Sequence, residues 1–136
     1  MTPTAAALLG FVAWTIFLVI ALAFYRTSLV MSGKRRANSF NPSGADVEGF
    51  GLRLTRAHAN CYENLPVAGA VLLYAIATGQ TAATDPFAYA FITARVLQSV
   101  VHLLSTSPTA VTARFALYLV QLAILVFWLA KLSGLL

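Results

Sequence analysis

Long runs of apolar residues, separated by shorter polar stretches, divide the chain into four segments. The runs cover residues 5–31, 52–79, 86–104 and 109–132. A helix needs about 20 mainly apolar residues to cross a bilayer core about 30 Å thick, and each run is close to that length or longer. The pattern therefore predicts an all-α integral membrane protein with four transmembrane helices.

The ends of the runs carry helix-capping residues that agree with this division. Gly79 and Gly134 lie where helix C-caps are common. The connections at 80–85 and 105–108 are short, which favours antiparallel packing of successive helices in a bundle. Three runs begin with an N-cap type residue directly before a proline: Thr2-Pro3, Asp85-Pro86 and Ser107-Pro108.

The segment 32–51 is the exception, because it is polar and rich in Gly, Ser and Asn. We expect a loop there, with a helical turn beginning at Asp46. Basic residues concentrate on its side of the bundle, and the opposite side has only Lys131, so the first loop should be cytosolic and both termini outside. The Lys34-Arg35-Arg36 run is interpreted as a topology signal or as a site that attracts an anionic ligand or headgroup. The basic residues on the loop side are Arg26, Lys34, Arg35, Arg36, Arg53 and Arg114.

Composition supports a membrane protein and excludes a soluble one. Hydrophobic residues make up 60% of the chain and charged residues 10%, against about 25% charged residues in a soluble domain. The net charge of +5 comes from basic residues beside apolar runs, so we expect a lipid bilayer and no nucleic acid as partner.

A cleaved signal peptide fits the first run poorly, because no basic residue precedes this long run. The single cysteine, Cys61, excludes an internal disulfide and is interpreted as a small interface residue.

The second run contains polar residues at helical spacing. Arg56, Asn60 and Glu63 are spaced i, i+4, i+7 and so share one face of a helix. Charges within a membrane are costly, and such residues usually face protein or a water-filled cavity. Pro66 follows, and because it cannot donate a backbone hydrogen bond, it either kinks the helix or is simply tolerated there.

The third run has a second polar stripe at Arg95, Gln98 and His102. Arg95 lies about 15 Å, and Glu63 about 16 Å, from the cytosolic ends of their helices. An Arg95–Glu63 ion pair is therefore expected, since two unpaired charges at this depth would be costly. The pair would either take part in ligand binding or only hold the helices together. His58 and His102 have no carboxylate or thiolate at ligand spacing, so no metal site is expected.

The stretch Arg-Ala-His-Ala-Asn-Cys-Tyr-Glu-Asn-Leu-Pro at 56–66 resembles the second-helix motif of the MAPEG family, the membrane-associated proteins in eicosanoid and glutathione metabolism. The Ala-Arg pair at 94–95 and the long basic first loop agree with it. The resemblance covers essentially the whole chain and is greater to the bacterial members. It implies a homotrimer of four-helix bundles in a bacterial inner membrane, with glutathione bound between subunits near the cytosolic side. The residues that it implies for glutathione binding are Arg56, Asn60, Glu63, Arg95 and Gln98.

The chain also departs from the family pattern. Gln98 and His102 stand where catalytic members commonly have tyrosines. Thr109 stands nearest to the position of an arginine that stabilises the glutathione thiolate, and Arg114 lies five residues later. We therefore expect Arg114 or His102 to be the catalytic group, in a membrane-bound glutathione-dependent transferase or peroxidase that acts on lipophilic electrophiles. The alternatives are a non-catalytic protein that binds a lipid or glutathione conjugate for a partner, and a scaffold or transport protein.

Overall fold

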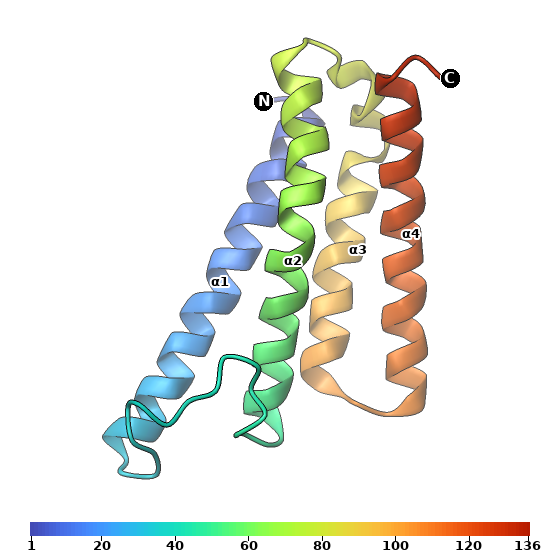
Figure 1. The fold of residues 1–136 in the computed structure, drawn as a ribbon. Coiled ribbons are helices and arrows are strands. Elements are labelled where there is room, and N and C mark those ends of the chain that lie inside the picture. Colours follow the sequence, from blue (N-terminus) through green and yellow to red (C-terminus); the bar gives the residue numbers. More distant parts are fainter.

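A computed structural model describes all residues, 1–136, and contains no β-strand. Successive long helices run antiparallel, and both termini lie at the same end of the bundle (Figure 1). The predicted all-α, antiparallel four-helix bundle is therefore confirmed, and every predicted helix end lies within two residues of the observed one. The elements are α1 (Pro3–Met31), α2 (Phe50–Ala77), the short 3-10 helix η1 (Thr81–Ala83), α3 (Asp85–Leu104) and α4 (Pro108–Leu132).

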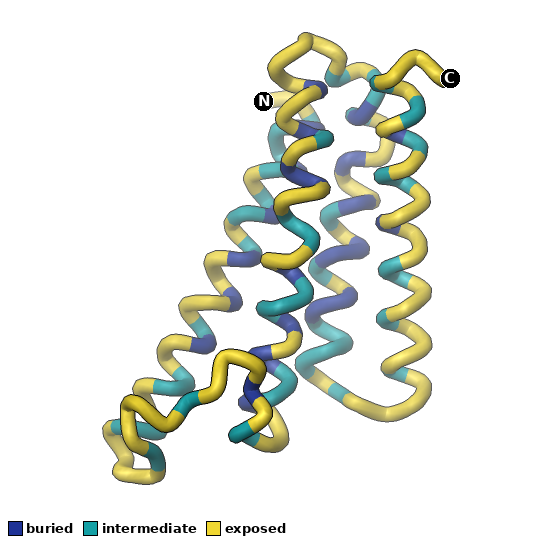
Figure 2. Tube along the Cα trace, in the orientation of Figure 1, coloured by how far each residue is buried: buried dark blue, intermediate teal, exposed yellow.

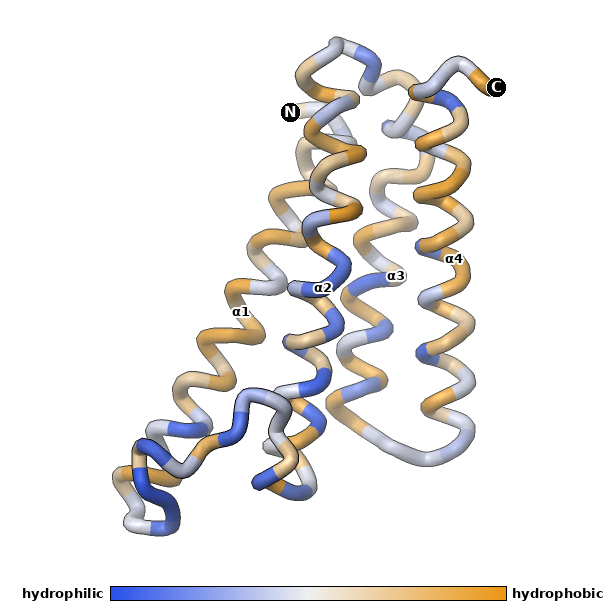
Figure 3. Tube along the Cα trace, viewed as in Figure 1, coloured by the Kyte–Doolittle hydropathy of each residue, from blue (hydrophilic) through white to orange (hydrophobic).

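The outer surface of the bundle is apolar, as a lipid environment requires. Exposed residues cover most of α4 and the outer side of α1 (Figure 2), and Figure 3 shows that α1 and much of α4 are hydrophobic along their length. Helices α1, α3 and α4 are long and apolar enough to cross a membrane. Helix α2 has a similar length and lies beside them, but its first half is polar (Figure 3). The chain is thus a membrane protein in which three of the four predicted transmembrane helices are apolar enough to span a bilayer, whereas α2 is too hydrophilic in its first half to meet this measure.

Large apolar side chains join the four helices in the interior. Phe11 of α1 packs edge-on against Phe91 of α3, with ring centroids 6.0 Å apart, and Phe91 also packs against Trp128 of α4 at 5.3 Å. Helix α1 packs along α2 and α3, and α3 packs along α4, whereas α2 and α4 contact each other sparsely. The arrangement therefore leaves space between α2 and α4.

Two of the three predicted N-caps are present. The hydroxyl oxygens of Thr2 and Ser107 accept hydrogen bonds from the backbone N–H of Ala5 (3.2 Å) and Ala110 (3.3 Å). The predicted cap at Asp85 is wrong, because Asp85 is the first residue of α3 and Thr84 precedes it as the cap. The cause is that η1 leads directly into α3, which leaves the Asp85 side chain free to face α1.

The Asp85 carboxylate instead ties the start of α3 to the start of α1. It accepts hydrogen bonds from the backbone N–H of Thr4 (2.9 Å) and from the Thr4 hydroxyl (2.6 Å), which also bonds to the Thr84 hydroxyl (2.6 Å). The N–H of Thr4 is one of the helix-terminal donors that no intrahelical carbonyl can satisfy. A negative charge at that end also complements the dipole of α1.

Replacing Asp85 with Ala should lower the free energy of unfolding by about 1–2 kcal/mol, because two hydrogen bonds to a charged acceptor are lost. Equilibrium unfolding in mixed detergent micelles measures this. Glu48→Ala is the matched control, since Glu48 is an exposed loop carboxylate with no hydrogen bond in the chain. Equal stability of the two variants would contradict the proposed contribution of the Asp85–Thr4 contact.

The first loop is a series of turns, and the helical turn predicted at Asp46 is absent. Asp46 forms an ion pair with Arg35 and accepts a hydrogen bond from the backbone N–H of Asn41 (2.9 Å), which closes the loop in a non-helical form. Partial burial acts to raise the pKa of Asp46, but these hydrogen bonds and the Arg35 charge outweigh it and hold the pKa below its ordinary value. Helix α2 begins only after Gly49, whose φ of 62° favours glycine.

Candidate functional site

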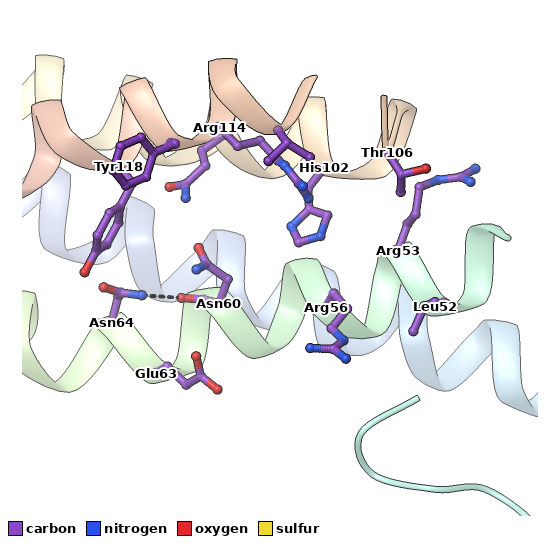
Figure 4. A pocket seen from close by; sticks show the side chains of 13 residues that line it. Leu52, Arg53, Arg56, Asn60, Glu63, Asn64, His102, Thr106, Arg114 and Tyr118 are labelled. Carbon is purple, nitrogen blue, oxygen red and sulfur yellow. Dashed lines mark hydrogen bonds between the residues drawn. The ribbon is translucent and has the colours of Figure 1, made fainter. Parts of the chain in front are cut away.

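A cavity of about 590 Å³ lies between α2, α3 and α4, toward the end of the bundle that carries the first loop. It occupies the space that the sparse contact between α2 and α4 leaves open. Figure 4 shows the side chains from these helices that line it. Its lining consists of Leu52, Arg53, Arg56, Asn60, Glu63, Asn64, Gln98, His102, Thr106, Val111, Arg114, Phe115 and Tyr118.

Helix α2 supplies the most polar wall. Arg56, Asn60 and Glu63 line the cavity at the helical spacing predicted from the sequence, and Arg53 continues the stripe by one turn. Arg56 and Glu63 are exposed and project from the outer side of α2, whereas Asn60 points into the bundle (Figure 4), where its side chain meets Arg95 of α3. The amide nitrogen of Asn64 donates a hydrogen bond to the backbone oxygen of Asn60 at 2.8 Å. The wall thus presents both charges of opposite sign and neutral amides.

The opposite wall comes from α3 and α4. Gln98 and His102 lie one helical turn apart on α3, and Arg114 of α4 extends toward His102 (Figure 4). The Nε atom of Arg114 is enclosed and has no hydrogen-bond partner in the chain. Val111 and Phe115 of α4 make the same wall partly apolar.

Arg95 does not line the cavity, although the family resemblance implied that it binds the ligand. Its side chain is 1% exposed, and its Nη1 donates to the side-chain oxygen of Asn60 at 2.6 Å. Its guanidinium group lies over the ring of Phe11, 5.1 Å from the centroid. Arg95 therefore lies behind the cavity and holds Asn60, which does line it.

The expected Arg95–Glu63 ion pair does not form within the chain. Distance along a helix does not fix rotation about the helix axis. Asn60 faces α3, and Glu63, three residues later, is turned away from it and exposed. The only ion pair within the chain joins Arg35 and Asp46.

Cys61 belongs to the packing between α2 and α3 rather than to the cavity. It is fully buried, and its Sγ lies 3.3 Å from the hydroxyl oxygen of Ser99, which itself donates to the backbone oxygen of Arg95 at 3.2 Å. This position agrees with the interpretation of Cys61 as a small residue at a helix interface.

Tyr118 and Asn64 also line the cavity, although neither was predicted as a site residue from the sequence. Tyr118 lies one turn after Arg114, and its hydroxyl is directed toward Asn64 (Figure 4). A signal was present, because Arg114, Tyr118 and Gln121 form an i, i+4, i+7 polar stripe in a mainly apolar helix. Thr109, nearest to the family's arginine position, does not line the cavity, whereas Arg114 does.

The charges around the cavity favour an anionic ligand with one cationic group. Three lining residues carry guanidinium groups, Arg53, Arg56 and Arg114, and only one, Glu63, carries a carboxylate. Guanidinium groups bind carboxylates through paired N–H donors, and this is strongest where water is partly excluded. The apolar residues on α4 would accept the hydrophobic part of a second molecule.

The model of the MAPEG family matches residues 4–133 of the chain. Comparisons with curated proteins and with solved structures gave no match.

Proposed function

Because the chain belongs to the MAPEG family, we propose that it is a membrane-bound glutathione-dependent transferase or peroxidase that acts on lipophilic electrophiles. One observation carries this proposal: three guanidinium groups and one carboxylate surround a cavity that also has apolar residues from α4. Family membership supports a glutathione-related activity in general, and the cavity supports the assignment of residues to it.

The cavity charges complement those of glutathione, which has two carboxylates, one ammonium group and a thiol. We assign Arg56 to a carboxylate, Glu63 to the ammonium group and Asn60 to a backbone amide of the tripeptide. We assign Arg53, which also lines the cavity, to the second carboxylate. Arg95 acts indirectly, because its hydrogen bond keeps the Asn60 side chain in one orientation.

The third cation of the cavity, Arg114, is assigned to the thiol. A free thiol titrates near about 8.5, and a nearby cation stabilises the thiolate at neutral pH. The thiolate would attack an electrophilic carbon, forming the S–C bond while the leaving group departs with its electron pair. With a lipid hydroperoxide, two glutathione molecules would be oxidised to the disulfide while the hydroperoxide is reduced to an alcohol and water. His102, beside Arg114, is the second candidate for thiol activation.

The electrophile would arrive from the bilayer. Val111 and Phe115 are 46% and 59% exposed on the outer surface of α4, and both also line the cavity. A lipophilic molecule could therefore pass along α4 from lipid to the thiolate without crossing a polar barrier.

We also propose a homotrimer in a bacterial inner membrane, with the first loop in the cytosol. The exposed positions of Arg56 and Glu63 support a neighbouring protomer that would enclose them. The concentration of basic residues at the loop end supports the orientation.

Replacing Arg56 with Ala should weaken glutathione binding about 10- to 100-fold, because a charge-assisted contact to a carboxylate is lost. Calorimetric titration of the protein in detergent measures the change. Arg36→Ala is the matched control, because it removes the same charge from the same end of the bundle, outside the cavity. Equal losses in both variants would indicate general electrostatic attraction rather than a site at Arg56. Binding by the wild-type protein without any thiolate absorbance or turnover would favour the non-catalytic alternative.

Glu63→Gln should leave the stability unchanged, since Glu63 is exposed and has no ion-pair partner in the chain. Glutathione affinity should fall about 5- to 20-fold, whereas affinity for an analogue that lacks the ammonium group should change little. Titrations of both ligands, alongside Glu48→Gln as a control, measure this. A uniform loss for both ligands would argue against the Glu63–ammonium contact.

A further inference from the structure

A pair of glutamines connects α3 and α4 directly behind the cavity. Gln98 lines the cavity and is 6% exposed, and Gln121 is 1% exposed and does not line it. The side-chain nitrogen of Gln121 donates to the side-chain oxygen of Gln98 at 2.9 Å and to the backbone oxygen of Leu117 at 2.8 Å. Neither hydrogen bond is part of the helical backbone pattern.

The backbone carbonyl of Leu117 fixes the direction of both hydrogen bonds. A carbonyl oxygen can only accept, so the Gln121 atom beside it must be the NH₂ group rather than the amide oxygen. Both hydrogens of that NH₂ group are then used, one on Leu117 and one on Gln98. The Gln98 atom that meets Gln121 must therefore be its oxygen.

This leaves the NH₂ group of Gln98 for the cavity. Its nitrogen has no hydrogen-bond partner in the chain and is not among the fully enclosed unpartnered atoms, so it is accessible from the cavity. Without Gln121, the Gln98 amide could turn over and present an oxygen instead. The oxygen of Gln121 remains buried without a partner in the chain, which has a cost in free energy.

We propose that Gln121 is a positioning residue that holds the Gln98 amide with its N–H donors toward the cavity, where they bind an anionic oxygen or sulfur of the ligand. The role toward glutathione rests on the proposed function above. The N–H donors of Gln98 supplement the guanidinium groups of the cavity. They favour a ligand that has a hydrogen-bond acceptor beside Gln98. Gln121 acts through Gln98 and does not touch the ligand.

The orientation of the two amides is tested first without ligand. The chain has only three glutamines, Gln80, Gln98 and Gln121, so ¹⁵N-glutamine labelling gives three side-chain amide signals in nuclear magnetic resonance spectra. Exchange with solvent should be fast for exposed Gln80, measurable for Gln98 and strongly slowed for Gln121. In Gln121→Met, the Gln98 signal should shift and broaden as both orientations are populated. A protected Gln98 amide or a rapidly exchanging Gln121 amide in the free protein would overturn the inference, whether or not the protein uses glutathione.

The functional role is tested by a double-mutant cycle with glutathione. Gln121→Met should weaken binding about fivefold in the wild-type background and less than about twofold in a Gln98→Met background. A residue that is only structural would give the same loss in both backgrounds, and that result would overturn the proposal, as would no loss in the wild-type background. Gln80→Met serves as the control and should leave affinity unchanged. Wild-type protein that binds no glutathione, but has the stated exchange pattern, would contradict the proposed function and leave the amide orientation standing.

Discussion

Replacing Arg114 with Gln should lower kcat for glutathione conjugation at neutral pH by about 100-fold or more, with a small change in KM. The removal of one group that stabilises a developing or reacting anion typically has an effect of this size. Arg114 is the cavity cation on the same wall as the apolar residues of α4. Arg114 forms no ion pair within the chain, and its enclosed Nε has no hydrogen-bond partner there. The measurement is turnover of chlorodinitrobenzene, together with the ultraviolet absorbance of the bound thiolate.

The pH profile separates thiol activation from a general loss of structure. Without the Arg114 charge, the pKa of bound glutathione should return toward the free value of about 8.5, so the rate should rise over a more alkaline range. Arg114→Lys keeps the charge and should retain part of the activity. If His102→Gln moves the pH profile and Arg114→Gln does not, then His102 is the activating group and the assignment to Arg114 is wrong.

Replacing Asn60 with Leu should lower the free energy of unfolding by about 2–3 kcal/mol, because the buried Arg95 charge then loses its side-chain acceptor. The 2.6 Å contact is charge-assisted, and Arg95 has no carboxylate partner in the chain. Its Nε is already enclosed without a partner. Leaving the Nη1 donor of Arg95 unsatisfied as well therefore lowers the free energy of unfolding. Unfolding in mixed micelles, with the helical circular dichroism signal as probe, measures it.

A second substitution shows whether the cost arises from the charge. In the double variant Arg95→Met/Asn60→Leu no charge is buried, and at least half of the lost stability should return, because apolar residues can replace a buried polar pair at little cost. Asn64→Leu is the matched control, since Asn64 bonds only within α2. A double variant that is less stable than Asn60→Leu would indicate that Arg95 stabilises the bundle by packing over Phe11 rather than through Asn60.

The sequence by itself determined the helices and the polar stripe of α2. In lipid the backbone must satisfy its own hydrogen bonds, so long apolar runs can only be helices, and prolines and glycines mark their ends. Helical periodicity then places Arg56, Asn60 and Glu63 on one face before any packing is known. The same reasoning located Gln98 and His102 on α3, and all five residues line the cavity.

Only the tertiary structure decided which side chains meet. Asn60 and Glu63 differ by about 60° around the axis of α2, and the packing of α2 against α3 turns Asn60, not Glu63, toward Arg95. The rotation of α4 likewise brings Tyr118 into the cavity, and the contact between Gln98 and Gln121 joins residues 23 positions apart. Spacing along one helix is fixed by its period, but the rotation of one helix against another depends on how all the side chains between them pack.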